Sequence, residues 1–168
     1  WVSELAWRDY FQQVWKHQGK GIFNDLKQPQ PDVQFRHLPN ALVTAGTGIA
    51  AIDEGLNKLQ QTGYMHNHLR MYTASIICNI GRCHWPQPAA WLYYHLLDGD
   101  LASNHCSWQW VAGSFSSKKY YCNQENINKY TSSTQRHSYL DASYDLLPGM
   151  PIPEALQTAA NTNLQTVL

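Results

Sequence analysis

Apolar side chains recur along most of this chain at intervals of three and four residues, the spacing that places them on one face of an α-helix. Over residues 2–17 the pattern is carried by Val2, Leu5, Ala6, Phe11, Val14 and Trp15. The same periodicity predicts helices over residues 47–61, 64–80, 86–97 and 100–113. Gly63 is expected to end the second helix, and Pro86 to open the fourth, because glycine favours helix C-termini and proline tolerates the first turn. No segment shows the two-residue alternation of a strand, so the sequence predicts an all-α fold.

The remaining segments lack helical periodicity. Residues 19–40 hold several glycines and prolines and are expected to form a loop. Residues 114–144 are rich in Ser, Asn, Gln, Lys and Tyr, which predicts loop with short helices, and residues 154–164 are expected to form a last helix. A length of 168 residues fits one domain or a large piece of one. Because the chain opens at Trp1 inside an apolar helical pattern, we interpret it as a piece of a longer protein.

The composition is poor in charge and rich in aromatic rings. Charged residues make up 14% of the chain, below the usual quarter, whereas aromatic residues reach 12% and include seven Trp and ten Tyr. The formal net charge is zero, so no overall field attracts nucleic acid and any DNA contact needs a local basic patch. The one basic-rich region consists of Lys118, Lys119, Lys129 and Arg136, interleaved with tyrosines. It is interpreted either as a weak DNA-contacting patch or as solvated loop residues.

The chain has no apolar run long enough for a membrane span and no visible signal peptide, so we expect a cytoplasmic protein. Its four cysteines, Cys78, Cys83, Cys106 and Cys122, form no C-x-x-C pair, and we expect reduced, partly buried thiols. His66 and His68 are two apart in a predicted helix and are expected to face different ways. We therefore expect no bound metal.

Polar side chains that could hold a ligand gather between residues 62 and 110. Arg70 can pair with Asp98 as a buried ion pair, and Asn104 lies one turn beyond Asp100, so that both can face one cavity. A purely structural interpretation is a buried salt bridge with helix caps, and core packing for the tryptophans. The alternative interpretation is a site for a large, flat ligand with polar edges, in which indoles stack or carry electrons.

Three segments carry a resemblance to a known family. They are residues 4–10 (ELAWRDY), 62–71 (TGYMHNHLRM) and 97–113 (LDGDLASNHCSWQWVAG). In their order and spacing they resemble the FAD-binding catalytic domain of the DNA photolyase/cryptochrome family. The resemblance implies that residues 1–168 form the C-terminal part of a helical FAD-binding domain, without the antenna domain and without the first half of the flavin domain. It also implies FAD as cofactor, and we expect residues 1–168 alone to bind it weakly.

The resemblance further implies roles for particular residues. Around the flavin it places Arg8, Asn67, Arg70, Asp98, Asp100 and Asn104. Toward a flipped-out pyrimidine dimer it places Glu4, Trp7, Met71 and Trp110. Trp108 and Trp85 match the inner and middle members of a photoreduction chain. The outer tryptophan of that chain is replaced by Phe35, a poor hole carrier, and Tyr72, Tyr93 or Tyr94 could substitute for it.

Other departures from the family pattern concern positions near the expected site. They are His68, the run from His105 to Ser107, and residues 116–126, which replace a segment directed toward DNA. The expected function is light-driven repair of DNA that contains pyrimidine dimers, by a monomer. One alternative is a cryptochrome-like blue-light photoreceptor, or a flavin-binding module, without repair activity. The other is a structural interaction domain that has lost its flavin.

Overall fold

Seven α-helices account for most of the regular structure within residues 2–161, the part of the chain that the computed structural model describes. They are α1 (Val2–Gln18), α2 (Asn40–Val43), α3 (Ala50–Thr62), α4 (Asn67–Ser75), α5 (Pro86–His95), α6 (Leu101–Ala112) and α7 (Gln124–Thr131). Short 3-10 turns cover Gly19–Phe23, Leu147–Gly149 and Glu154–Leu156. The β-pairing in these residues is confined to two isolated bridges, so the predicted all-α fold is confirmed.

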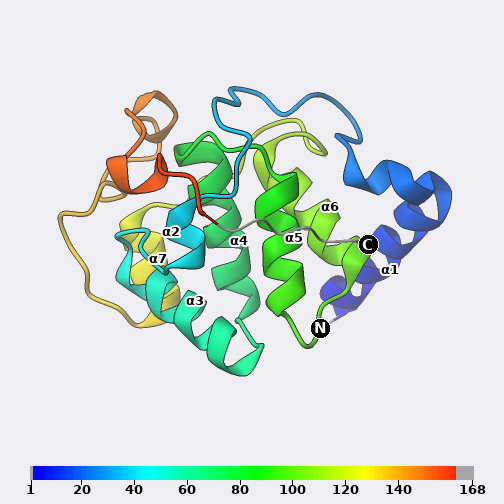
Figure 1. Cartoon of the computed structure of the whole chain (residues 1–168), viewed down its shortest axis with the longest axis horizontal. Helices are drawn as coiled ribbons and strands as arrows, with labels where there is room; N and C mark the ends of the chain where they lie inside the picture. Colours follow the sequence, from blue (N-terminus) through cyan, green and yellow to red (C-terminus); the bar gives the residue numbers. More distant parts are fainter. Residues whose placement is uncertain (1, 162–168) are drawn as a thin grey trace.

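The centre of the molecule consists of helices α4, α5 and α6 together with the π-helical segment Ile76–Ile80. Helix α1 lies at one end beside α6, whereas α3 and α7 lie at the other end (Figure 1). Between α1 and α2, residues 24–39 run as a long loop over the upper side of this view (Figure 1). The central helices and the residue that caps α5 bury large side chains, namely Tyr72, Trp91 and Trp108 in the helices and Trp85 at the cap.

Several helix ends differ from the predicted ones because local hydrogen bonds decide them. Helix α3 begins at Ala50 rather than residue 47, since the carboxylate of Asp53 accepts the backbone N–H of Thr47 at 2.8 Å and holds that residue outside the helix. Helix α4 begins at Asn67 rather than residue 64, with His66 as its N-cap. Gly63 ends α3 as predicted, with a left-handed φ of 71°.

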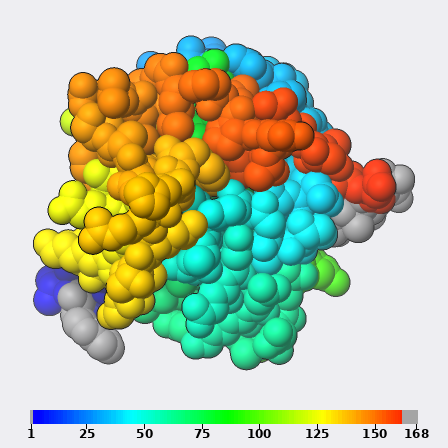
Figure 2. All heavy atoms as spheres, turned by 90° about the vertical axis from the view of Figure 1, so that its left-hand side faces the viewer, coloured from blue at the N-terminus to red at the C-terminus, as the bar shows by residue number. Residues whose placement is uncertain are grey.

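The C-terminal segment folds back over the helices instead of forming the predicted helix over residues 154–164. Only Glu154–Leu156 is helical, as a single 3-10 turn, and Ala159 then pairs with Pro39. Residues 162–164 lie outside the described residues. Figure 2 shows the yellow-to-red part of the chain covering the top and one side of the cyan α2–α3 region. Among residues 2–161, no helix has the length and apolar character needed to cross a membrane.

Candidate functional site

Three helices surround a hollow of about 200 Å³. Eight of the residues singled out by sequence line it, namely Arg8, Asn67, Arg70, Met71, Asp98, Asp100, Asn104 and Trp108. Helix α1 supplies Arg8, α4 supplies Asn67, Arg70 and Met71, and α6 with the turn before it supplies the other four. The wall of this hollow encloses less volume than the roughly 300–1,000 Å³ of pockets that enclose small ligands.

The ion pair predicted at this wall is present, but it is not buried. One guanidinium nitrogen of Arg70 lies 2.9 Å from each carboxylate oxygen of Asp98, and Arg70 Nε donates to the carbonyl of Met65 at 2.7 Å. The side chain of Asp98 is 53% exposed and that of Arg70 is 23% exposed. The prediction of a buried pair is therefore wrong for these residues. The reason is that Asp98 lies in the open turn between α5 and α6.

The carboxylate of Asp100 is held by the start of helix α6. One of its oxygens accepts the backbone N–H of Ser103 at 2.7 Å as an N-cap. The other accepts a hydrogen bond from the Gln12 amide of α1 and lies 3.7 Å from the guanidinium of Arg8. Asp100 therefore ties α1 to α6 at the edge of the hollow, and it presents negative charge there.

Two polar side chains on α6 bear on whether a cofactor fits. The Asn104 amide nitrogen donates to the carbonyl of Ala89 at 2.9 Å, which anchors this side chain at the wall. Ser103, which sequence reasoning missed, also lines the hollow, and its buried hydroxyl oxygen has no hydrogen-bond partner among the described residues. A buried hydroxyl without a partner is costly, so a polar ligand edge would satisfy it. A guanidinium, carboxylates, an amide and this hydroxyl suit a flat ring system with both donors and acceptors, such as a flavin.

A second hollow, of about 590 Å³, lies between α1 and the end of α6. It is lined by Ser3, Ala6, Trp7, Tyr10, Phe11, Lys27, Trp110 and Phe115. Trp7 is 54% exposed and Trp110 is 37% exposed, so both residues leave surface accessible at this hollow. Glu4 lies in the exposed first turn of α1 and lines neither of these two hollows.

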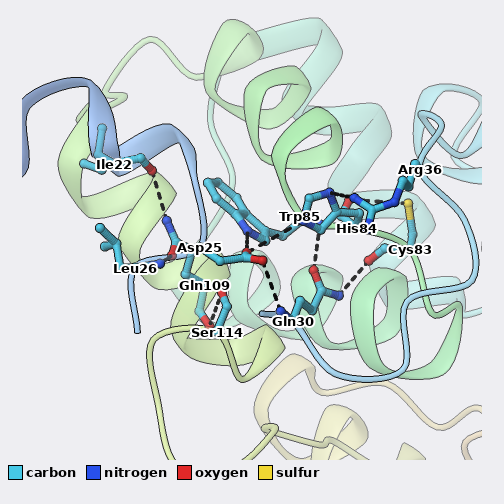
Figure 3. Close-up of polar contacts among 10 residues, drawn as sticks. All are labelled: Ile22, Asp25, Leu26, Gln30, Arg36, Cys83, His84, Trp85, Gln109 and Ser114. Carbon is cyan, nitrogen blue, oxygen red and sulfur yellow. Dashed lines mark hydrogen bonds and ion pairs between the residues drawn. The ribbon is translucent and has the colours of Figure 1, made fainter. Parts of the chain in front are cut away.

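The two tryptophans predicted to carry electrons lie deeper. Trp108 is almost fully buried and lines the first hollow, whereas Trp85 is fully buried just before α5. The ring of His105 packs edge-to-face against Trp85 at 5.8 Å, and burial lowers the pKa of this histidine to about 4. The Trp85 indole N–H donates to a carboxylate oxygen of Asp25 at 2.7 Å (Figure 3). Sequence reasoning missed Asp25 because it lies in the long loop, far from Trp85 in the chain.

Phe35 lies half-buried beside the segment that carries Trp85. It forms an isolated parallel bridge with Cys83, and its carbonyl accepts the backbone N–H of His84 at 2.8 Å. The backbone of residue 35 is thus held within two residues of Trp85. Tyr72, by contrast, is buried in the core, and Tyr94 is exposed on α5.

The predicted basic patch is weaker than its sequence suggests. The ammonium of Lys119 is 2.9 Å from the carboxylate of Asp32, and this contact lowers the pKa of Asp32. Lys129 lies 5.5 Å from the ring of Tyr130, and Lys118 and Arg136 are exposed. Lys119 is therefore engaged within the protein, while the other three cations face solvent.

The expected orientation of His66 and His68 is wrong, and the cysteines are free as expected but more deeply buried. The rings of His66 and His68 stack at 5.3 Å rather than facing different ways, because His66 precedes the helix as its cap instead of lying within it. All four cysteines are free and fully buried rather than partly buried, and burial raises the pKa of Cys83, Cys106 and Cys122 to about 12. Within residues 2–161, no group of three or more His, Cys, Asp or Glu side chains is placed to hold a metal ion.

Comparison with known proteins gives consistent matches. A family model described as the FAD binding domain of DNA photolyase matches residues 1–144. The deoxyribodipyrimidine photo-lyase of Synechococcus sp. is 35% identical over 117 residues, which are 68% of this chain and 24% of that protein. The deoxyribodipyrimidine photo-lyase of Escherichia coli is 33% identical over 121 residues, 68% of this chain and 25% of that protein.

Cryptochromes match as well. Cryptochrome DASH of Xenopus laevis is 33% identical over 115 residues, which are 67% of this chain and 22% of that protein. A crystal structure of a Synechocystis sp. cryptochrome is similar with a TM-score of 0.69 at 27% identity, over 78% of this chain and 28% of that one. The chain thus spans about a quarter of the length of these curated relatives.

Proposed function

Because the chain belongs to the DNA photolyase/cryptochrome family, we propose that it is part of a light-driven DNA repair enzyme that splits pyrimidine dimers. The observation that carries the proposal is the pairing of two hollows on the same two helices. Helix α1 gives Arg8 to the first hollow and Trp7 to the second, and α6 gives Trp108 to the first and Trp110 to the second. A cofactor in one hollow and a base in the other would be close neighbours.

The first hollow is proposed to hold the isoalloxazine side of FAD. The residues that would hold it are Arg8, Asn67, Arg70, Asp98, Asp100 and Asn104. Arg70 would donate to ring carbonyls or stabilise negative charge on the ring, while the carboxylates would accept from ring or sugar donors. Asn104 would contact a ring nitrogen, since an amide can donate or accept as protonation changes. Reduced FAD, when bound and excited by blue light, supplies the electron that splits the dimer.

The second hollow is proposed to receive the pyrimidine dimer, two joined neighbouring bases of one DNA strand. A dimer inside a duplex cannot reach a buried cofactor, so it must be flipped out. Trp7 and Trp110 would stack on the flipped bases, because exposed indoles bind a flat, partly apolar ligand well. Met71 would line the boundary on the cofactor side, and Glu4 would hydrogen-bond to the dimer or protonate its radical anion from the open end of α1.

Trp108 and Trp85 are proposed to return the flavin to its reduced state by passing electrons inward. Trp108 lines the cofactor hollow, and Trp85 is fully buried in the core. Indole is far easier to oxidise than a phenyl ring, so both are suited to carry a hole outward. These roles rest on the family resemblance and on the burial of the two rings.

The test is a combined spectrum and repair assay. Protein of a length that retains FAD should show flavin absorbance and should remove dimers from ultraviolet-irradiated DNA under blue light but not in the dark. The double variant Trp7→Ala, Trp110→Ala should keep its flavin and lose repair. Trp15→Ala is the matched control, because Trp15 is a partly exposed indole of α1 outside the second hollow. A protein that takes up no FAD would contradict the proposal.

A cryptochrome-like photoreceptor without repair is the second candidate. The observation in its favour is the ion pair between Lys119 and Asp32, which removes one cation from the predicted DNA-contacting segment. DNA binding depends strongly on such cations. Flavin absorbance without light-dependent loss of dimers would favour this candidate over the repair enzyme.

A further inference from the structure

The buried indole of Trp85 is hydrogen-bonded to a carboxylate that is partly exposed to solvent. Its indole ring is fully buried, and its N–H donates to Asp25 Oδ1 at 2.7 Å. The side chain of Asp25 is 23% exposed, so this carboxylate contacts both the buried indole and water. Indole N–H is a donor only, and a neutral backbone carbonyl would satisfy it equally well. Satisfying the indole N–H therefore does not require the negative charge of Asp25.

The carboxylate is held firmly in place. Its second oxygen accepts the backbone N–H of Gln30 at 3.1 Å, and the Gln30 amide in turn donates to the carbonyl of Cys83 and accepts the backbone N–H of Trp85 (Figure 3). Gln30 thus holds the loop against the backbone of Trp85, the residue whose indole donates to Asp25. The distance between indole and carboxylate is therefore fixed by three hydrogen bonds and does not depend on a free side chain.

Two further groups face this carboxylate. His84 Nε2 lies 3.7 Å from Asp25 Oδ1, and His84 Nδ1 lies 3.1 Å from a guanidinium nitrogen of Arg36. Because Arg36 can only donate, Nδ1 of a neutral His84 accepts and its proton is on Nε2, facing Asp25. His84 cannot then take up another proton at the face toward Asp25, which leaves the carboxylate as the acceptor closest to the indole.

We propose that Asp25 accepts the indole proton of Trp85 when this indole is oxidised, an inference that rests on the proposed function. The oxidant is a photoexcited flavin acting through Trp108. Trp85 loses one electron toward Trp108, its N–H bond breaks, and the proton forms an O–H bond with Asp25 Oδ1. The products are a neutral indolyl radical and a carboxylic acid, which releases its proton to water on its exposed side.

This step would stand in for the outer indole that Phe35 replaces. A cation on a fully buried ring is costly in a medium of low dielectric, so without an outlet the electron returns. Phenylalanine cannot take over the hole, because a phenyl ring is much harder to oxidise than an indole. Loss of the proton to Asp25 removes the charge from the buried ring and lets the radical persist.

A first measurement needs no cofactor. In protein with 15N-labelled indoles, the N–H resonance of Trp85 should shift as acid protonates the Asp25 carboxylate, because a charge-assisted hydrogen bond is replaced by a weaker one. Asp25→Asn should abolish this shift while keeping an acceptor oxygen. A Trp85 resonance that shifts equally in Asp25→Asn would overturn the proposal, since protonation of His84 would then be the cause.

The deciding measurement is flash spectroscopy of the flavin-loaded protein. The wild type should form a long-lived neutral tryptophanyl radical, more slowly in D2O, and Asp25→Asn should give only a short-lived cation radical with a several-fold lower final yield. Asp32→Asn is the matched control, because it removes a carboxylate from the same loop but contacts Lys119 instead of an indole. An unchanged neutral radical in Asp25→Asn would overturn the role of Asp25 but leave the proposed function standing. A flavin-loaded wild type without any tryptophanyl radical would overturn the electron path of the proposed function as well.

Discussion

Among single residues, Asp98 shows how solvent exposure limits what an ion pair contributes to stability. Its carboxylate is bonded to Arg70 at 2.9 Å, yet the side chain is 53% exposed. We expect Asp98→Ala to lower the free energy of unfolding by no more than about 1 kcal/mol, as for other exposed pairs. FAD affinity should fall much more, because Arg70 loses the partner that orients it. Urea unfolding and flavin titration measure the two effects, and a stability loss of several kcal/mol would mean that the pair is buried in solution.

At Ser103, removal of the hydroxyl group should raise the free energy of unfolding of the protein without FAD. Its buried hydroxyl has no partner among the described residues, and such a group costs about 1–3 kcal/mol. Ser103→Ala keeps the backbone N–H that Asp100 caps, so the free energy of unfolding should rise by about 1 kcal/mol without FAD. Ser75→Ala is the control, because that hydroxyl donates to the carbonyl of Tyr120 at 2.7 Å and its loss should destabilise. If Ser103→Ala destabilises the empty protein, a bound water satisfies the hydroxyl.

At the scale of helices, the apolar periodicity predicted the existence of the elements better than their ends. Helix α6 matches the prediction to within one residue at each end, because Asp100 and Gly113 are recognisable as its N-cap and C-cap in the sequence. The start of α4 was misplaced because a histidine cap leaves no clear sequence signal. The π-helical segment Ile76–Ile80 carries the same apolar residues as an α-helix, so periodicity could not distinguish them.

The candidate site was predictable to the same degree. Helical spacing placed Asp100 and Asn104 on one wall, whereas the residues of α4 were assigned to it by the family resemblance. Asp25 could not be predicted, because its contact with Trp85 spans 60 residues and depends on the course of a loop. The exposure of Asp98 was equally hidden, since it depends on which elements cover the turn between α5 and α6.

Helix α6 also carries a histidine that should make stability depend on pH. Burial lowers the pKa of His105 to about 4, below its ordinary value of 6.5, so the folded protein binds this proton less well than the unfolded chain. The contribution of neutral His105 to the free energy of unfolding is fully present above pH 6.5. It is lost as the pH falls toward 4, by about 3 kcal/mol at most. His105→Gln should flatten this part of the pH profile in urea unfolding. Parallel profiles for the two proteins would mean that His105 is accessible to water.

At the scale of the whole molecule, the loop of residues 24–39 joins the two ends of the fold and carries both Asp25 and Phe35. Phe35→Trp should place an indole beside the segment of Trp85 and speed light-driven oxidation toward solvent, measured as flavin photoreduction under blue light with an external reductant. In that background Asp25→Asn should matter less, because the hole no longer has to remain on Trp85. If Phe35→Trp leaves an already fast rate unchanged, tyrosines such as Tyr93 are the next residues to replace.

Helix α1 contributes to both hollows, yet Phe11 is its one buried residue within the described range. A helix that buries so few of its own side chains is expected to open often, because most helical stability in proteins comes from packing an apolar face. Its backbone amides before Phe11 should therefore exchange with deuterium within seconds, while those of α6 exchange only when the whole protein unfolds. Binding of a ligand in either hollow should slow exchange in α1 first, which makes this helix a reporter of occupancy by mass spectrometry without any light or cofactor signal.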